Sequence, residues 1–244
     1  MRNVHLDQLI EPQGLYLERR IQHGQPIIFS EHGAPVGYAI LGADQGLLEF
    51  FVNPEFHQAM NSLFLQTARR FDICTVLCQS HDSALLACCL DEGSGVEVLR
   101  YSFRDQQVPV GRFDPPWKEL RPAVASDVAK IKAVVHGLFD APAEVEKAIE
   151  NKMLMIYTIN NSLLGCGLFQ QVIHDRFDYD IGALVHPAHR GKGVGTAIIR
   201  HLIGHVQSLG GRPIAGCAVM NIGARRTLEK AGFVSHYRLL SFSL

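Results

Sequence analysis

The stretch HPAHRGKGVGTAI, residues 186–198, places three glycines at alternate positions directly behind an arginine. The glycines are Gly191, Gly193 and Gly195, and the arginine is Arg190. An apolar helical pattern follows at once. Glycine lets the backbone approach a ligand closely, and the first amides of a helix point at an anion bound there. The stretch therefore predicts an anion-binding loop between a strand and a helix.

Neighbouring side chains support a phosphate ligand. Arg190 and Lys192 add positive charge, and Thr196 adds a hydroxyl at the helix start. The Walker A pattern GxxxxGK[ST] is absent, and the dinucleotide pattern GxGxxG would need a glycine at position 196. A pyrophosphate fits the loop, although an isolated triplet of this kind is more typical of a plain turn, so its context decides.

The context is an alternation of strands and helices over residues 118–244. A short strand leads to a helix that we expect to begin at Ser126 as its N-cap, and PAEVEKAIENK predicts a second helix. A hairpin follows across Asn160 and Asn161. Then come the strand DYDIGALV, the glycine loop with its helix, a strand, a helix ending at Gly232, and one last strand, FVSHYRLLSF.

Weak internal similarity indicates that this pattern occurs twice. LERRI (17–21) matches VEKAI (145–149), FVNPEF (51–56) matches LVHPAH (184–189), and RYSF (100–103) matches LLSF (239–242). The offsets grow in order along the chain, as small insertions in the second copy would cause. We therefore predict a domain at 1–104, a Pro-rich linker at 105–117 and a second domain at 118–244.

Two motifs resemble those of a known family. Residues 190–195 match the R/Q-x-x-G-x-G/A signature of the GNAT superfamily, the acyl-CoA-dependent N-acyltransferases, and NIGARRTLEKAGF (221–233) is similar to its motif N-x-x-A-x-x-x-Y-E-K-x-G-F. The resemblance is firm over 118–244 and weak over 10–104. It implies an α/β (α+β) fold of two tandem GNAT-like domains, each a mixed, mostly antiparallel sheet flanked by helices.

The resemblance also implies how acetyl-CoA would bind. The pantetheine arm would pair with the strand ending at Val185, in an opening toward the strand ending near Val219, and the pyrophosphate would lie on the glycine loop. Arg225 and Arg226 would reach the adenosine 3′-phosphate, or else form an exposed helix face. The expected cofactor-binding residues are Leu184, Val185, Arg190, Gly191, Lys192, Gly193, Val194, Gly195, Thr196, Asn221 and Arg225.

Acyl transfer to an amine requires a base, and in this family the base is often a carboxylate on the strand before the loop. Asp180 and Asp178 lie on the same face of that strand by alternation, and Asp180 is nearer the expected thioester. A purely solvating role is equally consistent with both. Leu228 stands where the family has its usual tyrosine acid, so Tyr237, Tyr157 or water would have to protonate the thiolate.

The first copy lacks the loop. His57, Met60 and Ser62 stand where Arg190, Gly193 and Gly195 stand in the second copy, and Asp82 replaces Asn221. We therefore expect one CoA site per chain.

Composition limits the other function classes. The net charge is -1, with 8 Lys and Arg against 14 Asp and Glu up to residue 116, and 15 against 10 from residue 117. This balance argues against a nucleic-acid partner and places an anionic ligand in the second half. Neither a long apolar run nor a signal-peptide pattern is present, so a cytoplasmic protein without membrane contact is expected.

No metal site is expected. The six cysteines lack zinc spacing and are predicted to be buried, reduced thiols, and His201 and His205 are predicted to lie on a solvated helix face. The sequence thus predicts an acetyl-CoA-dependent N-acetyltransferase acting on a primary amine of a small molecule, amino acid or peptide, as a monomer or homodimer. The alternative is a non-catalytic acyl-CoA sensor or scaffold.

Overall fold

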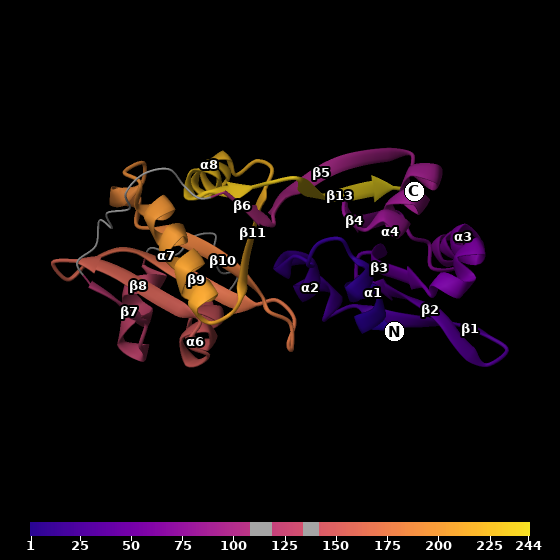
Figure 1. Ribbon diagram of the computed structural model, residues 1–244, viewed down its shortest axis with the longest axis horizontal. Helices are drawn as coiled ribbons and strands as arrows, with labels where there is room; N and C mark the ends of the chain where they lie inside the picture. Colours follow the sequence, from indigo (N-terminus) through magenta and orange to yellow (C-terminus); the bar gives the residue numbers. More distant parts are fainter. Residues whose placement is uncertain (108–118, 134–141) are drawn as a thin grey trace. The chain divides into compact units, whose positions relative to one another are not determined.

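The computed structural model describes residues 1–107, 119–133 and 142–244, which form two compact units (Figure 1). The first unit contains Met1–Ser102, Gly216–Met220 and Ser235–Leu244. The second contains Phe103–Ala215 and Asn221–Val234. Each unit has a mixed sheet with helices against it, as the sequence predicts.

The sheet of the first unit has the order β1-β2-β3-β4-β13-β5. Only β3 and β4 are parallel, and the other neighbouring pairs are antiparallel. The elements are α1 (Arg2–Gln8), α2 (Leu15–Ile21), β1 (Gln25–Glu31), β2 (Ala34–Leu41), β3 (Gly46–Val52), the 3-10 helix η1 (Pro54–Ala59), α3 (Met60–Arg70), β4 (Thr75–Gln79), α4 (Ser83–Glu92), β5 (Gly95–Phe103) and β13 (Tyr237–Ser243).

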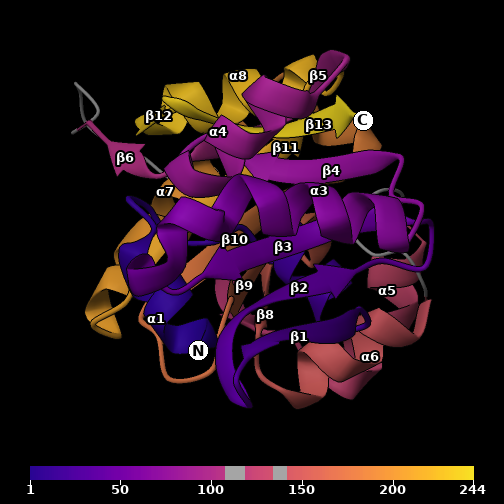
Figure 2. The same ribbon diagram turned by 90° about the vertical axis from the view of Figure 1, so that its right-hand side faces the viewer.

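Helices cover both faces of this sheet. On one face α3 and α4 enclose a core that includes Phe50, Phe64 and Leu85, and α3 crosses in front of β3 and β4 in Figure 2. On the other face α2 contributes Leu17 and Ile21 to a second core.

In the second unit the sheet order is β11-β10-β9-β8-β7. Among the described strands of this sheet, only β10 and β11 are parallel. The elements are β6 (Asp105–Gln106), β7 (Glu119–Pro122), η2 (Ala125–Asp127), α5 (Val128–Lys132), α6 (Pro142–Glu150), β8 (Leu154–Ile159), β9 (Ser162–Gln171), β10 (Asp178–Val185), η3 (Pro187–His189), α7 (Val194–Ser208), β11 (Arg212–Ala218), α8 (Ile222–Ala231) and β12 (Phe233–Val234).

The last predicted strand is divided between the two units, which the sequence did not reveal. Phe233–Val234 pair with β6 in the second unit. Tyr237–Ser243 form β13, which lies between β4 and β5 in the first unit (Figure 1). Of the expected linker 105–117, residues 108–117 lie outside the described part, and Asp105–Gln106 are the strand β6. The boundaries at 104 and 118 stay a prediction.

Several local predictions can be compared directly with the structure. The hairpin turn is confirmed, because Asn160 and Asn161 have φ values of 49° and 62°, as a tight two-residue turn requires. Ser126 is not an N-cap, since it lies inside the 3-10 turn η2. Asp127 instead accepts a hydrogen bond from the Val124 amide at 2.9 Å. Residues 134–139 of the predicted helix lie outside the described residues.

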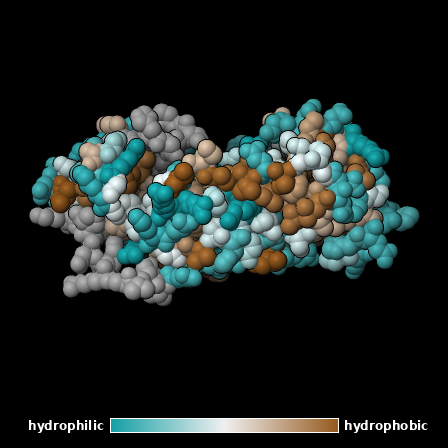
Figure 3. Space-filling view, turned by 90° about the horizontal axis from the view of Figure 1, so that it is seen from above, coloured by the Kyte–Doolittle hydropathy of each residue, from teal (hydrophilic) through white to brown (hydrophobic). Residues whose placement is uncertain are grey.

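Five of the six cysteines are buried, as expected, but Cys74 is exposed. Some apolar side chains are also exposed, among them Leu90, Val96 and Val98, and Figure 3 shows hydrophobic residues gathered together on an otherwise largely hydrophilic face. No helix within the described residues is long and apolar enough to span a membrane.

Candidate functional site

The glycine loop of residues 190–196 joins η3 to α7. Gly191 and Gly193 have φ values of 73° and 80°, a left-handed conformation that residues with a Cβ avoid. Gly193 is the N-cap of α7, and its carbonyl accepts the first helical hydrogen bond, from Ala197 at 3.0 Å. An added Cβ at either glycine would meet no atom within 4 Å. The loop conformation, not crowding, therefore requires these two glycines.

Gly195 has a different role from the one the sequence indicated. It lies in the first turn of α7, where a Cβ would come within 3.2 Å of Thr227 on α8 and 3.3 Å of Val185 on β10. These contacts are tight, so glycine here lets α7 begin close against its neighbours. Thr227 is a residue that sequence reasoning missed, and its contact with Gly195 has no signature in the sequence.

The basic side chains of the loop hydrogen-bond to backbone carbonyls of the residues that precede the loop. Arg190 Nε donates to the Val185 carbonyl at 3.2 Å, and Lys192 Nζ donates to the Ala188 carbonyl at 2.9 Å. Both hydrogen bonds are exposed, so the two positive charges remain at the surface beside the N-terminus of α7. Backbone amides at a helix N-terminus together with nearby cations favour an anionic ligand.

The strand before the loop loses its parallel partner early. β10 pairs with β11 from Asp178 to Asp180, opposite Arg212–Ile214. Within the described part of the chain, no strand pairs with β10 on that side beyond Asp180. The outer side of Ile181–Val185 is therefore available for backbone hydrogen bonds.

Backbone direction corrects one expected contact. The His186 amide donates to Leu164 on β9, and the Asp178 carbonyl accepts from Val172, so even-numbered peptide groups of β10 face β9. Arg212 on β11 donates to the Phe177 carbonyl, so odd-numbered groups face the other side. An arm added beside β10 would thus meet the backbone of Ala183 and Val185, not that of Leu184.

Asn221 and Arg225 lie on α8. Asn221 is its N-cap, with Oδ1 accepting from the Ala224 amide at 3.0 Å, so only its amide NH2 remains to donate to a ligand. Arg225 forms an ion pair with Glu229 at 2.8 Å, whereas Arg226 is exposed. The pair with Glu229 fits the exposed-face interpretation of Arg225.

Asp178 and Asp180 share one face of the sheet, as alternation predicts. Leu184, on the same face of β10, packs with Ile131 of α5 and Val145 of α6, so both carboxylates lie on the α5–α6 side. Asp180 is the last β10 residue paired with β11, and Asp178 is two residues further from the unpaired segment. Asp180 is thus the carboxylate nearer that segment.

Tyr157, one of the candidate proton donors, is buried beneath α7. Its side chain is fully buried, and burial raises the pKa of its hydroxyl. The hydroxyl lies 2.8 Å from His201 Nδ1 on α7, on the sheet face opposite Asp180. Leu228 is buried in α8 and carries no proton to donate, and Tyr237 belongs to the first unit.

The prediction that His201 and His205 lie on a solvated helix face is wrong. Both are half-buried, with His201 bonded to Tyr157 and the His205 ring 4.8 Å from that of Phe169. Burial first, and then the charge of His205, lower the pKa of His201. α7 thus contacts the sheet over a wider arc than its apolar stripe of Ile198, Leu202 and Val206, because β9 has glycines at positions 165 and 167.

The corresponding place in the first unit has no loop. η1 ends at Ala59 and α3 begins directly at Met60, whose φ is −57°. A continuous helical path therefore replaces the two left-handed glycines. Asp82 caps α4 by accepting from Leu85 at 3.1 Å, as Asn221 caps α8, which supports the alignment of the two copies.

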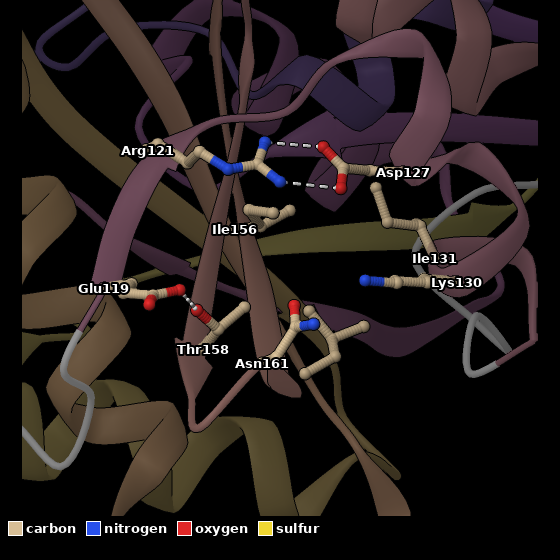
Figure 4. A pocket seen from close by; sticks show the side chains of 9 residues that line it. Glu119, Arg121, Asp127, Lys130, Ile131, Ile156, Thr158 and Asn161 are labelled. Carbon is tan, nitrogen blue, oxygen red and sulfur yellow. Dashed lines mark hydrogen bonds and ion pairs between the residues drawn. The ribbon is translucent and has the colours of Figure 1, made fainter.

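A small pocket lies elsewhere in the second unit, at the edge formed by β7, β8 and α5 (Figure 4). Its volume of about 20 Å³ has room for a water molecule. Arg121 and Asp127 form two hydrogen bonds across it, of 2.6 and 2.8 Å, and Thr158 donates to Glu119. These hydrogen bonds connect β7 to η2 and to β8 at the edge of the sheet.

Comparisons with known proteins agree with the two-copy pattern. Residues 1–106 match the sequence profile "Acetyltransferase (GNAT) domain", and residues 127–233 match "Acetyltransferase (GNAT) family". No curated protein matches the chain.

Many solved structures share its fold, and three of them illustrate the similarity to this chain. A GNAT-family acetyltransferase from Colwellia psychrerythraea has a TM-score of 0.90 at 19% identity, with 100% of this chain and 94% of that chain covered. A GCN5-related N-acetyltransferase from Sphaerobacter thermophilus has 0.63 at 15%, covering 90% and 80%. A tandem GNAT protein from the clavulanic acid biosynthesis pathway has 0.62 at 13%, covering 98% and 93%.

Proposed function

Because the chain belongs to the GNAT superfamily of acetyltransferases and carries two such domains in tandem, we propose that it transfers an acetyl group from acetyl-CoA to a primary amine. The acceptor would be a small molecule, an amino acid or a peptide. The observation that carries the proposal is the pair of left-handed glycines, Gly191 and Gly193, at the N-terminus of α7 beside the unpaired end of β10.

The residues present fit acetyl-CoA. The amides of the glycine loop and the charges of Arg190 and Lys192 favour its pyrophosphate. The backbone of Ala183 and Val185 is oriented to pair with the pantetheine arm, which carries amide groups of its own. In this proposal the amide NH2 of Asn221, the N-cap of α8, donates to the arm. The first unit lacks the glycine loop, so we propose one CoA site per chain.

In this proposal Asp180 is the general base. An amine is mostly protonated at neutral pH, so a proton must leave before nitrogen attacks the acetyl carbonyl. Asp180 accepts this proton directly or through a water molecule. A backbone amide near Val185 donates a hydrogen bond to the carbonyl oxygen as negative charge develops there. Water protonates the departing thiolate, since Leu228 replaces the tyrosine of the family motif.

The second candidate function is a non-catalytic acyl-CoA sensor or scaffold. Leu228 favours it, because this buried side chain removes the family's common route for protonating the thiolate. The glycine loop and Asn221 serve either function equally.

Thioester consumption separates the two. The purified protein is incubated with acetyl-CoA and a panel of primary amines, and free thiol is measured against a Gly193→Val variant as the control. Turnover with at least one amine, reduced in the variant when acetyl-CoA is below saturation, supports the transferase. Tight CoA binding by calorimetry without turnover on any amine would support the sensor.

A further inference from the structure

The first unit has a strand arrangement like that beside the glycine loop. β3 and β4 are parallel but pair only at Gly46–Thr75 and Leu47–Val76. Beyond these pairs the two strands bring polar side chains into the interior. Glu49 of β3 is 2% exposed, and Gln79 at the end of β4 is 5% exposed. Buried carboxylates and amides are costly unless they have hydrogen-bonding partners.

The N-terminal segment, residues 1–14, supplies those partners on both strands. Arg2 Nε donates to Glu49 Oε1 at 3.0 Å, and Gln13 Nε2 donates to Glu49 Oε2 at 3.3 Å. Gln79 Nε2 donates to Gln13 Oε1 at 3.1 Å, and the Gly14 amide donates to Gln79 Oε1 at 3.0 Å. The segment thus joins β3 and β4 where they no longer join each other.

His5 extends this contact to the N-terminus of α4. Its Nε2 lies 3.7 Å from Asp82 Oδ2, at the capping position that Asn221 holds in the second unit. Its ring packs on Phe51 of β3 at 5.5 Å and on Tyr38 at 6.3 Å. His5 is itself 4% exposed, so α1 is anchored in the interior.

Arg2 pairs with two buried carboxylates at once. Its guanidinium makes two hydrogen bonds to Glu18 of α2, at 3.1 and 2.5 Å, and two to Glu49, at 3.0 and 3.2 Å. Burial would raise the pKa of Glu49, but hydrogen bonds from Arg2 and its charge outweigh burial and hold that pKa below its usual value. Tyr38 and Gln13 donate further bonds to the pair.

We propose that residues 1–14 are a built-in ligand of the first unit, whose Arg2 side chain fills a guanidinium site formed by Glu18 and Glu49 where β3 and β4 stop pairing. The planar guanidinium makes two hydrogen bonds to each of the two carboxylates. An ammonium group cannot reproduce this geometry. Where the second unit presents amides and cations to an anion, the first presents carboxylates to a cation. The inference does not depend on acetyl transfer.

Chemical rescue tests the proposal in the full chain. Arg2→Ala removes the guanidinium partner of Glu18 and Glu49. We expect the thermal transition of the first unit, followed by circular dichroism, to fall by roughly 5–15 °C. Methylguanidinium at millimolar concentration should enter the vacated site and raise that transition by several degrees. Tetramethylammonium at equal ionic strength, a cation without N–H donors, should have no such effect.

Two control variants make the test specific. Arg20→Ala removes an exposed ion pair with Asp44 and should shift the transition by at most about 2 °C, without a methylguanidinium response. Arg2→Ala combined with Glu18→Gln and Glu49→Gln removes the unpaired charges and should also lose the response. If Arg2→Ala is recovered unfolded, methylguanidinium should restore its refolding.

The proposal is overturned if Arg2→Ala melts like Arg20→Ala. It is equally overturned if methylguanidinium acts no better than tetramethylammonium on Arg2→Ala, whether on its melting or on its refolding.

Discussion

Replacing Gly193 by valine should specifically damage the glycine loop. Gly193 has a φ of 80°, and a left-handed conformation costs a residue with a Cβ about 1–2 kcal/mol. A β-branched side chain belongs at the upper end of that range. If the loop relaxes to avoid this cost, the first amides of α7 turn away from the bound pyrophosphate. A loss of 1–2 kcal/mol corresponds to about 5–30-fold weaker CoA binding.

Isothermal calorimetry with CoA measures this loss, and Gly204→Ala is a matched control in the same helix. Gly204 lies within α7, where a Cβ would meet no atom within 4 Å. Alanine is favoured over glycine in a helix by about 1 kcal/mol, so this variant should be more stable and bind CoA as the wild type does. The two substitutions add side chains to one helix and should have opposite effects on stability.

Unchanged CoA affinity in a folded Gly193→Val protein would refute the placement of the phosphates on the loop. If Gly204→Ala weakened binding as much, the property that matters would be the dynamics of α7, not the conformation at its N-cap.

Three further outcomes are expected. Asp180→Asn should lower the acetylation rate about 10²–10⁴-fold with CoA affinity unchanged. The deficit in rate should shrink at high pH, where free amine is abundant. A larger deficit in Asp178→Asn would reverse the ranking of the two carboxylates. Calorimetry should give one CoA per chain in the wild type and in Met60→Gly, and two equivalent sites would contradict the loss of the first loop. Because His201 has a lowered pKa in the folded state, the unfolded chain takes up a proton more readily below about pH 6.5, so stability should fall as the pH is lowered through and below that value. Urea unfolding of His201→Gln should show a smaller fall over that range, and an equal fall would exclude His201 as its source.

The glycine loop could be predicted because its determinants are local. Left-handed positions at Gly191 and Gly193, and the turn at Asn160–Asn161, depend on residues adjacent in sequence. The role of Gly195 was not predictable, because its close neighbour Thr227 comes from another helix.

Long-range partners explain the other errors. His201 lies off the apolar stripe of its helix, and only the fold shows that buried Tyr157, 44 residues earlier, meets it. Residues 1–14 carry no motif, and their importance appears only when Arg2 is seen against Glu49. A strand pattern over 233–242 likewise predicts strands but does not say which sheet each one joins.

The place of β13 has a consequence for the order in which the chain folds. On the ribosome, β4 and β5 are synthesised long before Tyr237–Ser243, with more than half the chain between β5 and β13. Until β13 arrives, the nascent first unit exposes the backbone of two strand edges, which are sites of intermolecular pairing. The first unit to be translated therefore cannot be the first to reach its native sheet. Chains that terminate early will leave the ribosome as aggregation-prone species even when every residue of 1–104 is present.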